Sequence, residues 1–395
     1  MISERIKNLA PSATLAMSQK SAELKASGID VINLSVGEPD FNTPDFIKEA
    51  AKRAIDDNFS RYSPVAGYMS LRKAICEKLK RDNGLDYTPE QIVVGNGAKQ
   101  ELANNILSLI NPGDEVIIPV PAWVSYVEMV KLAEGKSVLV EASLENDFKI
   151  TPGQLEAAIT PKTKMLLLNS PCNPTGSVYS RDELMGLADV LKKYPRVTVM
   201  SDEIYEHINY VGELASIAEF DWMKQRTVII NGVSKAYAMT GWRVGYLAAP
   251  LEIAKAVTKL QGQYTSGASS IAQKAAEAAY EGPQDCVEEM RKAFERRRDL
   301  IVSLAAQIEG WKINRPEGAF YLFPDVSSYI GKKYSQYEIK SSGDYVMYLL
   351  QEAHVACVDG EAFCAPGYMR LSYATSDENI REAMRRIREA SSRLK

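Results

Sequence analysis

Histidine is scarce in this chain of 395 residues, which contains only His207 and His354. This scarcity excludes a histidine-rich metal site, and we predict no metal centre. The five cysteines are odd in number and widely spaced, so they suggest neither a metal framework nor a set of disulfides. Such cysteine usage fits a reducing compartment.

Long apolar runs are also missing. None approaches the roughly 18 residues of a transmembrane helix, and the N-terminus lacks the charged-then-apolar pattern of a secretory signal. We therefore expect a cytoplasmic protein without membrane contact. The net charge of −4 gives no electrostatic reason to bind nucleic acid. We interpret the basic runs 296–298 and 385–386 as solvated helix faces.

Strands and helices alternate through most of the chain. Short apolar runs such as 92–94, 165–169, 197–201 and 227–230 read as buried strands, and helical patterns separate them. This alternation predicts an α/β protein with a mostly parallel, doubly wound sheet. Ligands of such sheets bind at the carboxyl ends of the strands.

Several boundaries can be predicted from local chemistry. Thr43 and Pro44 are expected to cap and begin a helix that ends near Asn58, and Gly84 should stop the helix 70–83. A short strand is expected at 31–36. After about residue 275 the sequence pattern changes from alternating strands and helices to long helices, including 285–307 and 377–394. This change suggests a second, smaller α+β domain.

The stretch 227–246, TVIINGVSKAYAMTGWRVGY, places Lys235 after a buried strand and Arg243 within a second apolar run, 242–249. Lysine is rarely buried without a function. A partly desolvated amine has a lowered pKa and can form a Schiff base with an aldehyde, while Ser234 and Arg243 could hold an anion beside it. The alternative is a solvated lysine and a structural arginine ion pair.

Two other strand ends carry polar side chains. Asp202 closes the strand 197–201 and could keep a pyridinium nitrogen protonated; Tyr205 follows it, and Asn173 lies in a proline-rich turn. The strand–glycine–helix junction 92–100 directs free N–H groups at an anion, although it matches neither nucleotide-binding glycine motif. Each of these residues could instead be a cap or turn residue. One pocket could hold Asn173, Asp202 and Lys235.

Six motifs occur in an order that resembles a known family. Together they are similar to the class I, pyridoxal-phosphate-dependent aminotransferases of fold type I, and in particular to the bacterial aspartate aminotransferase branch (subgroup Ib-like). The resemblance covers essentially the whole chain. The motifs are SVGEPDF (35–41), YSPVAG (62–67), NPTG (173–176), DEIY (202–205), SKAYAMTGWRVGY (234–246) and RLSYA (370–374).

The resemblance implies a large cofactor-binding domain, residues 42–285, with a mostly parallel sheet of the seven-stranded type sandwiched by helices. Residues 1–41 and 286–395 would form the small α+β domain. It also implies a homodimer with shared active sites, in which Tyr62 reaches the phosphate of the neighbouring subunit.

The same resemblance implies roles for named residues. Lys235, Asp202 and Tyr205 would be catalytic: the lysine forms the Schiff base, the aspartate pairs with the pyridine nitrogen, and Tyr205 binds the ring oxygen. The phosphate or ring of the cofactor would also contact Ala98, Lys99, Trp123, Asn173, Ser234 and Arg243, and Tyr62 of the partner. Substrate would contact Gly37, Lys99, Trp123, Asn173 and Arg370, where the Arg370 fork suits an α-carboxylate.

The implied reaction is reversible amino transfer from L-aspartate to 2-oxoglutarate by a ping-pong mechanism. Alternatives within the scaffold are an aminotransferase for prephenate or aromatic amino acids, a β-lyase, or a cyclopropane-forming synthase. A non-catalytic regulator is a further alternative, but such regulators carry an added DNA-binding segment, which we do not expect here. Lys99 is the expected cation for the distal carboxylate, because the segment 264–270 contains no arginine or lysine; otherwise Lys99 is solvated or adds to the phosphate site.

Overall fold

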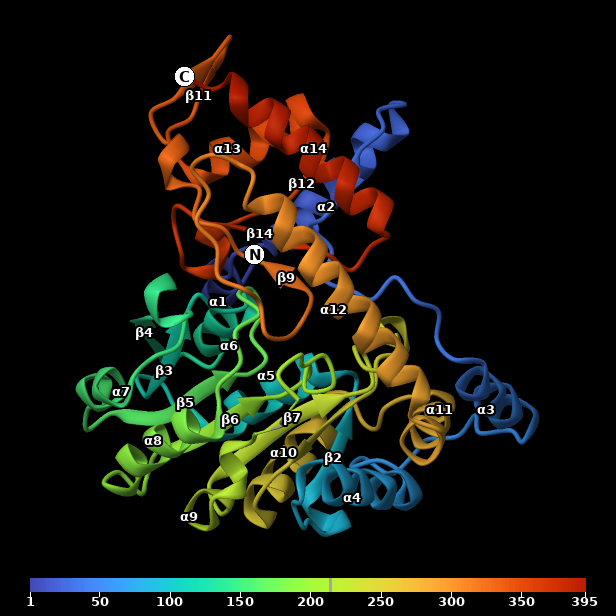
Figure 1. Cartoon of the computed structure of the whole chain (residues 1–395). Helices are drawn as coiled ribbons and strands as arrows, with labels where there is room; N and C mark the ends of the chain where they lie inside the picture. The colour runs from blue at the N-terminus through green and yellow to red at the C-terminus, as the bar shows by residue number, and fades with distance from the viewer. Residues whose placement is uncertain (213–214) are drawn as a thin grey trace.

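The computed structural model describes residues 1–212 and 215–395. Its centre is a seven-stranded sheet in the order β2-β8-β7-β6-β5-β3-β4 (Figure 1). Only β8 runs antiparallel to its neighbours, and every other adjacent pair is parallel. The strands are β2 (Ile92–Gly95), β3 (Glu115–Val120), β4 (Lys136–Glu141), β5 (Thr163–Asn169), β6 (Thr198–Asp202), β7 (Thr227–Gly232) and β8 (Gly245–Ala248).

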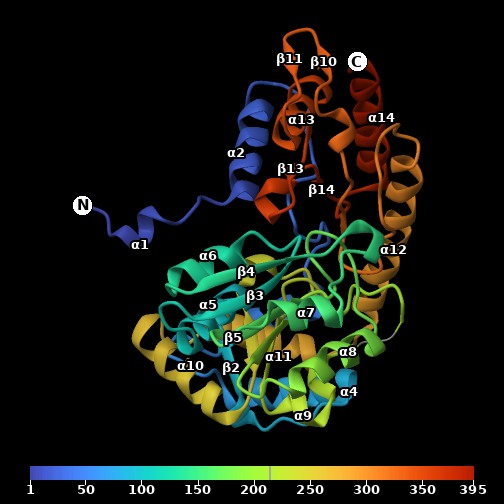
Figure 2. The same cartoon turned by 90° about the vertical axis from the view of Figure 1, so that its left-hand side faces the viewer.

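Helices cover both faces of the sheet because successive strand residues point to opposite sides. Val228 and Ile230 of β7 join the apolar cluster under α5, α6 and α10, whereas Ile229 joins the cluster under α3, α4 and α11. The α7 and α8 helices cover the rest of the second face. These helices are α3 (Asp45–Asp56), α4 (Met69–Asn83), α5 (Ala98–Leu109), α6 (Ser125–Leu132), α7 (Pro152–Ala158), α8 (Arg181–Lys192), α10 (Leu251–Tyr264) and α11 (Ser270–Glu281). The predicted helix-flanked, mostly parallel sheet is confirmed (Figure 2).

The two ends of the chain pack together on a second core. β1 (Ile32–Asn33) pairs in parallel with β12 (Val355–Ala356), and β13 (Val358–Asp359), β14 (Met369–Ser372) and β9 (Tyr321–Leu322) form an antiparallel sheet. The long α12 (Asp285–Ala305) extends from beside α11 up to α14 (Asp377–Arg393) (Figure 1). Besides short 3-10 helices, the remaining described elements are α1 (Glu4–Lys7), α2 (Ala13–Ala26), α9 (Asp221–Lys224), α13 (Ser342–Tyr348) with a π-helical turn Leu349–Ala353, and the hairpin β10 (Lys333–Tyr334) and β11 (Tyr337–Glu338).

Two local predictions need correction. The helix α3 begins at Asp45 with Pro44 as its N-cap residue, and the Thr43 hydroxyl donates instead to the carbonyl of Ala238 (2.7 Å). The strand expected at 31–36 has only two residues, because the side chain of Asn33 accepts from the Ser35 amide (2.9 Å) and turns the chain. By contrast, Gly84 ends α4 in the left-handed conformation, as predicted (φ 66°).

The arginine run in α12 is not a solvated face. Arg297 and Arg298 are only 7% and 4% exposed. Arg297 pairs with Asp40, and Arg298 donates to the carbonyl of Pro316 (2.7 Å). Only Arg296 lies on the exposed side of the helix. Among the described residues, no helix is long and apolar enough to cross a membrane.

Candidate active site

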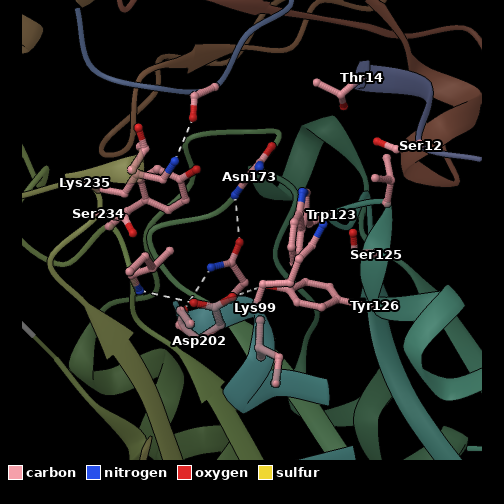
Figure 3. Close-up of a pocket in the computed structure, with 18 of the residues that line it drawn as sticks. Ser12, Thr14, Lys99, Trp123, Ser125, Tyr126, Asn173, Asp202, Ser234 and Lys235 are labelled. Atoms are coloured by element: carbon pink, nitrogen blue, oxygen red, sulfur yellow. Dashed lines mark hydrogen bonds between the residues drawn. The ribbon is translucent and has the colours of Figure 1, made fainter. Parts of the chain in front are cut away.

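A cavity of about 400 Å³ opens at the carboxyl ends of β5, β6 and β7 (Figure 3). Because these parallel strands end at one edge of the sheet, the residues that follow them meet there. The cavity brings together every site residue predicted from the sequence except Tyr62. Those lining it are Gly37, Ala98, Lys99, Trp123, Asn173, Asp202, Tyr205, Ser234, Lys235, Arg243 and Arg370.

Lys235 lies in the turn after β7, with its ammonium group inside the cavity. Its Nζ donates to the carbonyl of Gly37 (2.7 Å) and lies 5.7 Å from the centre of the Tyr205 ring. Burial lowers the pKa of the Lys235 amine to about 8; Glu38 opposes this shift, and the charges of Arg370 and Arg243 add to it. Roughly a tenth of the amine is therefore unprotonated at pH 7, far more than for an ordinary lysine, and a nucleophile or base acts in this form.

Asp202 ends β6 and is almost fully buried (3% exposed). Its Oδ2 accepts a hydrogen bond from the Tyr126 hydroxyl (2.6 Å), and its Oδ1 accepts from the Ile204 amide (3.2 Å). Burial raises the pKa of this carboxyl to about 6, although both hydrogen bonds and the Lys235 charge oppose the rise. A cationic partner in the cavity would remove this cost, since an adjacent positive charge favours the ionised form.

Arg370 comes to the same cavity from β14. Its guanidinium donates to Asn173 Oδ1 (2.9 Å) and to the carbonyl of Ser35 (2.6 Å), and it lies 4.5 Å from the centre of the Tyr321 ring. The side chain is 2% exposed, and its Nε has no hydrogen-bond partner among the described residues. A buried cation with an unused donor can bind a carboxylate.

The N-terminus of α5 and Arg243 together form a candidate anion site. Gly97 has a φ of 86°, and a Cβ added there would lie 2.4 Å from the Arg243 guanidinium. A Cβ added at Gly245 would lie 2.1 Å from the Ala98 amide nitrogen. Glycine at these two positions therefore lets the arginine and the helix N-terminus approach closely. Free N–H groups and a guanidinium together suit a phosphate group.

Residues 29–387 match the family model described as "Aminotransferase class I and II". The chain belongs to this family. It is 50% identical over 389 residues to an aspartate/prephenate aminotransferase of Cereibacter sphaeroides (98% of this chain, 97% of that protein) and 49% identical over 388 residues to an aspartate aminotransferase of Geobacillus stearothermophilus (98% of each).

Solved structures agree with the sequence comparison. The aspartate aminotransferase from Rhizobium meliloti matches with a TM-score of 0.96 at 44% identity and covers 100% of each chain. The enzyme from Thermus thermophilus with maleate matches with a TM-score of 0.93 at 42% identity and covers 99% of each chain. The chain is therefore a transaminase, an enzyme that acts on amino acids and 2-oxo acids.

Some features of this aminotransferase were not predicted. Tyr126 and Tyr321 line the cavity and bind Asp202 and Tyr205 respectively, the second through a hydroxyl–hydroxyl contact of 2.7 Å. The N-terminal segment also contributes, through Ser12, Thr14 and Leu15. Tyr321 was missed because it lies in an apolar run that reads as core. Tyr126 could have been predicted, because a buried Asp202 carboxylate requires a hydrogen-bond donor.

Tyr62 lies apart from the cavity. It is 98% exposed, so its ring has few contacts within its own chain. A large aromatic side chain in this state is suited to contact another molecule. The described residues contain no group of three or more side chains with the composition and spacing of a metal site.

Proposed function

We propose that this transaminase is an aspartate aminotransferase that uses pyridoxal 5′-phosphate. It would transfer the amino group of L-aspartate to 2-oxoglutarate, giving oxaloacetate and L-glutamate by a ping-pong mechanism. The observation that carries the proposal is the convergence of Lys235, Asp202 and Arg370 on one cavity beside an anion site. The names of the relatives support aspartate as the donor.

The residues present fit the cofactor. The anion site of Ala98, Ser234 and Arg243 suits its phosphate, and the close approach at Gly97 leaves the guanidinium beside the helix N-terminus. Asp202, which forms no ion pair among the described residues although the Lys235 charge acts on it, suits a pyridinium nitrogen. Tyr205 and Asn173 would bind the ring oxygen, and Trp123 would stack on the ring. When bound, pyridoxal phosphate supplies an aldehyde for the amino group and a ring that accepts electrons.

The chain's own residues would carry out the remaining steps. Arg370 binds the α-carboxylate of the substrate together with Asn173 and the Gly37 backbone, which orients the Cα–H bond. The unprotonated Lys235 Nζ takes the proton from Cα and later returns one, and its lowered pKa suits both tasks. Asp202, as a carboxylate, would stabilise the positive charge of the protonated ring nitrogen, which favours electron withdrawal by the ring.

We further propose that residues 42–285 act as the large domain and that 1–41 with 286–395 act as the small domain. Arg370 lies on β14 and Gly37 follows β1, two strands that contribute to the second core. In contrast, Asp202 ends β6 and Lys235 follows β7, both in the large sheet. Substrate held by Arg370 would therefore draw the small domain over the cavity and exclude water.

Lys99 is our proposed ligand for the distal carboxylate of aspartate. Its Nζ lies 4.9 Å from the centre of the Trp123 ring, at the wall of the cavity. Burial and the nearby Arg243 lower the pKa of the amine, so an added anion would be favourable there. A lysine is a single point charge, so transamination of prephenate or of aromatic amino acids remains a second proposal. The name of the Cereibacter relative favours prephenate.

Finally, we propose a cytoplasmic homodimer in which Tyr62 reaches the phosphate of the neighbouring subunit. The exposure of Tyr62 supports the homodimer, because this side chain is free to contact a second subunit. An isologous interface would place two such tyrosines symmetrically. Five free thiols support a reducing compartment.

The proposal is tested by Lys235→Ala. We expect this variant, mixed with pyridoxal phosphate, to lack the visible absorption band of the wild-type holoenzyme and to lose turnover by orders of magnitude. The exposed Lys52→Ala is the matched control and should keep both. Near-normal transamination by Lys235→Ala would refute the assignment of Lys235.

A further inference from the structure

One backbone segment, Ser35 to Asp40, contacts two of the basic residues that line the cavity, Lys235 and Arg370. The Lys235 ammonium donates to the carbonyl of Gly37 (2.7 Å), the bond drawn from Lys235 in Figure 3. The Arg370 guanidinium donates to the carbonyl of Ser35 (2.6 Å). Because main-chain carbonyls cannot rotate independently of the chain, the path of this segment decides where the two acceptors lie.

The first end of the segment is held by the fold. The amides of Ile32 and Leu34 donate to the carbonyls of His354 and Ala356 (2.9 Å each), and the carbonyl of Leu34 accepts from the Ser372 amide (2.8 Å). Beyond Leu34 the regular pairing stops. In the middle of the segment, Glu38 accepts one exposed hydrogen bond from Thr240 (2.8 Å).

The second end is held by α12. Both carboxylate oxygens of Asp40 accept from the guanidinium of Arg297, at 2.7 and 2.9 Å. The arginine is 7% exposed, and its guanidinium lies 5.2 Å from the ring centre of Phe41 and 5.7 Å from that of Phe294. A bidentate pair fixes orientation as well as distance, and the two aromatic rings beside the guanidinium restrict the arginine further.

We infer that Arg297, acting through Asp40, is a positioning residue for Lys235 and Arg370. By fixing the second end of the 35–40 segment, it keeps the carbonyls of Ser35 and Gly37 in place. The inference rests on the proposed roles of Lys235 and Arg370. Displacements of about 1 Å in positioned groups can cost up to a hundredfold in rate, so this buried pair affects the site although it touches no reacting atom.

The neighbouring arginine provides a matched control. Arg296 also forms two hydrogen bonds with a carboxylate, that of Asp377 (3.2 Å each), but its side chain is 61% exposed and its partner lies at the start of α14. Arg296→Met therefore removes a similar ion pair from the same helix without releasing the 35–40 segment.

The test uses the holoenzyme and maleate, a dicarboxylate that has no amino group to transfer. Maleate affinity is measured by spectral titration, and hydrogen–deuterium exchange of the 35–40 segment is measured by mass spectrometry. We expect Arg297→Met to bind maleate roughly tenfold more weakly and to exchange faster in this segment. Arg297→Lys makes a single contact in place of a fork, so its maleate affinity and exchange rate should lie between those of Arg297→Met and the wild type. Arg296→Met should match the wild type in both measurements.

Maleate affinity within twofold of the wild type and unchanged exchange in folded Arg297→Met would overturn the inference. If that variant does not fold, Asp40→Asn carries the same test, because it removes the charge of the pair and keeps its shape. A wild-type holoenzyme that fails to bind maleate would contradict the proposed function instead. The exchange of the 35–40 segment then decides the inference alone.

Discussion

Glu101 offers a quantitative prediction about stability. It is completely buried on α5, and neither carboxyl oxygen has a hydrogen-bond partner among the described residues. Burial raises its pKa well above the usual 4.5. The neighbouring Asn104 opposes this rise, but its effect is smaller than that of burial. The carboxyl is therefore neutral in the folded protein at pH values at which the unfolded chain has lost the proton.

The sign of the effect follows from this difference. Because the folded state binds the extra proton, the free energy of unfolding falls as the pH rises above 4.5. The loss is about 1.4 kcal/mol per pH unit until the folded carboxyl itself ionises. Glu101→Gln cannot ionise and does not share this loss. Relative to the wild type, its free energy of unfolding should therefore rise as the pH increases above 4.5.

The measurement is urea unfolding of both proteins, followed by tryptophan fluorescence, between about pH 5 and pH 7. The introduced amide also lacks a hydrogen-bond partner, which shifts the free energy of unfolding of Glu101→Gln by about 1–3 kcal/mol at every pH. This shift does not change the slope of that free energy against pH. Glu77→Gln on the exposed side of α4 makes the same charge change and should give parallel curves. Parallel curves for Glu101→Gln as well would refute the reasoning.

Three further predictions concern the site. Asp202→Asn should leave the cofactor-free protein equally or more stable above about pH 6, because burial raises the pKa of this carboxyl and its ionised form costs stability there. Its single-turnover rates with aspartate should nevertheless fall by orders of magnitude, and unchanged rates would make Asp202 structural. Lys99→Ala should lose about a hundredfold in kcat/KM with aspartate, from a cost of about 2–4 kcal/mol, and much less with tyrosine; equal losses would assign Lys99 to the phosphate. Mixing inactive Lys235→Ala and Tyr62→Ala subunits should restore some activity in hybrid dimers, whereas a fully active monomer in sedimentation would contradict a shared site.

Most of the fold and the membership of the cavity could be predicted from the sequence. Buried strands such as β6 and β7 are short apolar runs, and the polar residues that follow them must meet at one edge of a parallel sheet. Asn173, Asp202 and Lys235 therefore gather without reference to any distant contact.

The rest depends on contacts between distant segments. The apolar run at 242–249 contains Arg243, which adopts a left-handed conformation (φ 56°), so β8 begins only at Gly245. Arg297 and Arg298 were read as solvated because they are charged. However, they lie three and four residues after Phe294 and before Ile301, on the buried stripe of α12. Their burial is possible because Asp40 and a main-chain carbonyl provide partners.

The central claim is that aspartate is the amino donor. The most direct test adds single amino acids to the purified holoenzyme and measures the 2-oxo acid formed. Aspartate, tyrosine and phenylalanine serve as donors with 2-oxoglutarate as the acceptor, and glutamate serves as the donor when prephenate is the acceptor. We expect oxaloacetate from aspartate at the highest kcat/KM, with parallel double-reciprocal plots from the ping-pong mechanism. Absence of oxaloacetate, while an aromatic donor or prephenate turns over, would contradict the claim.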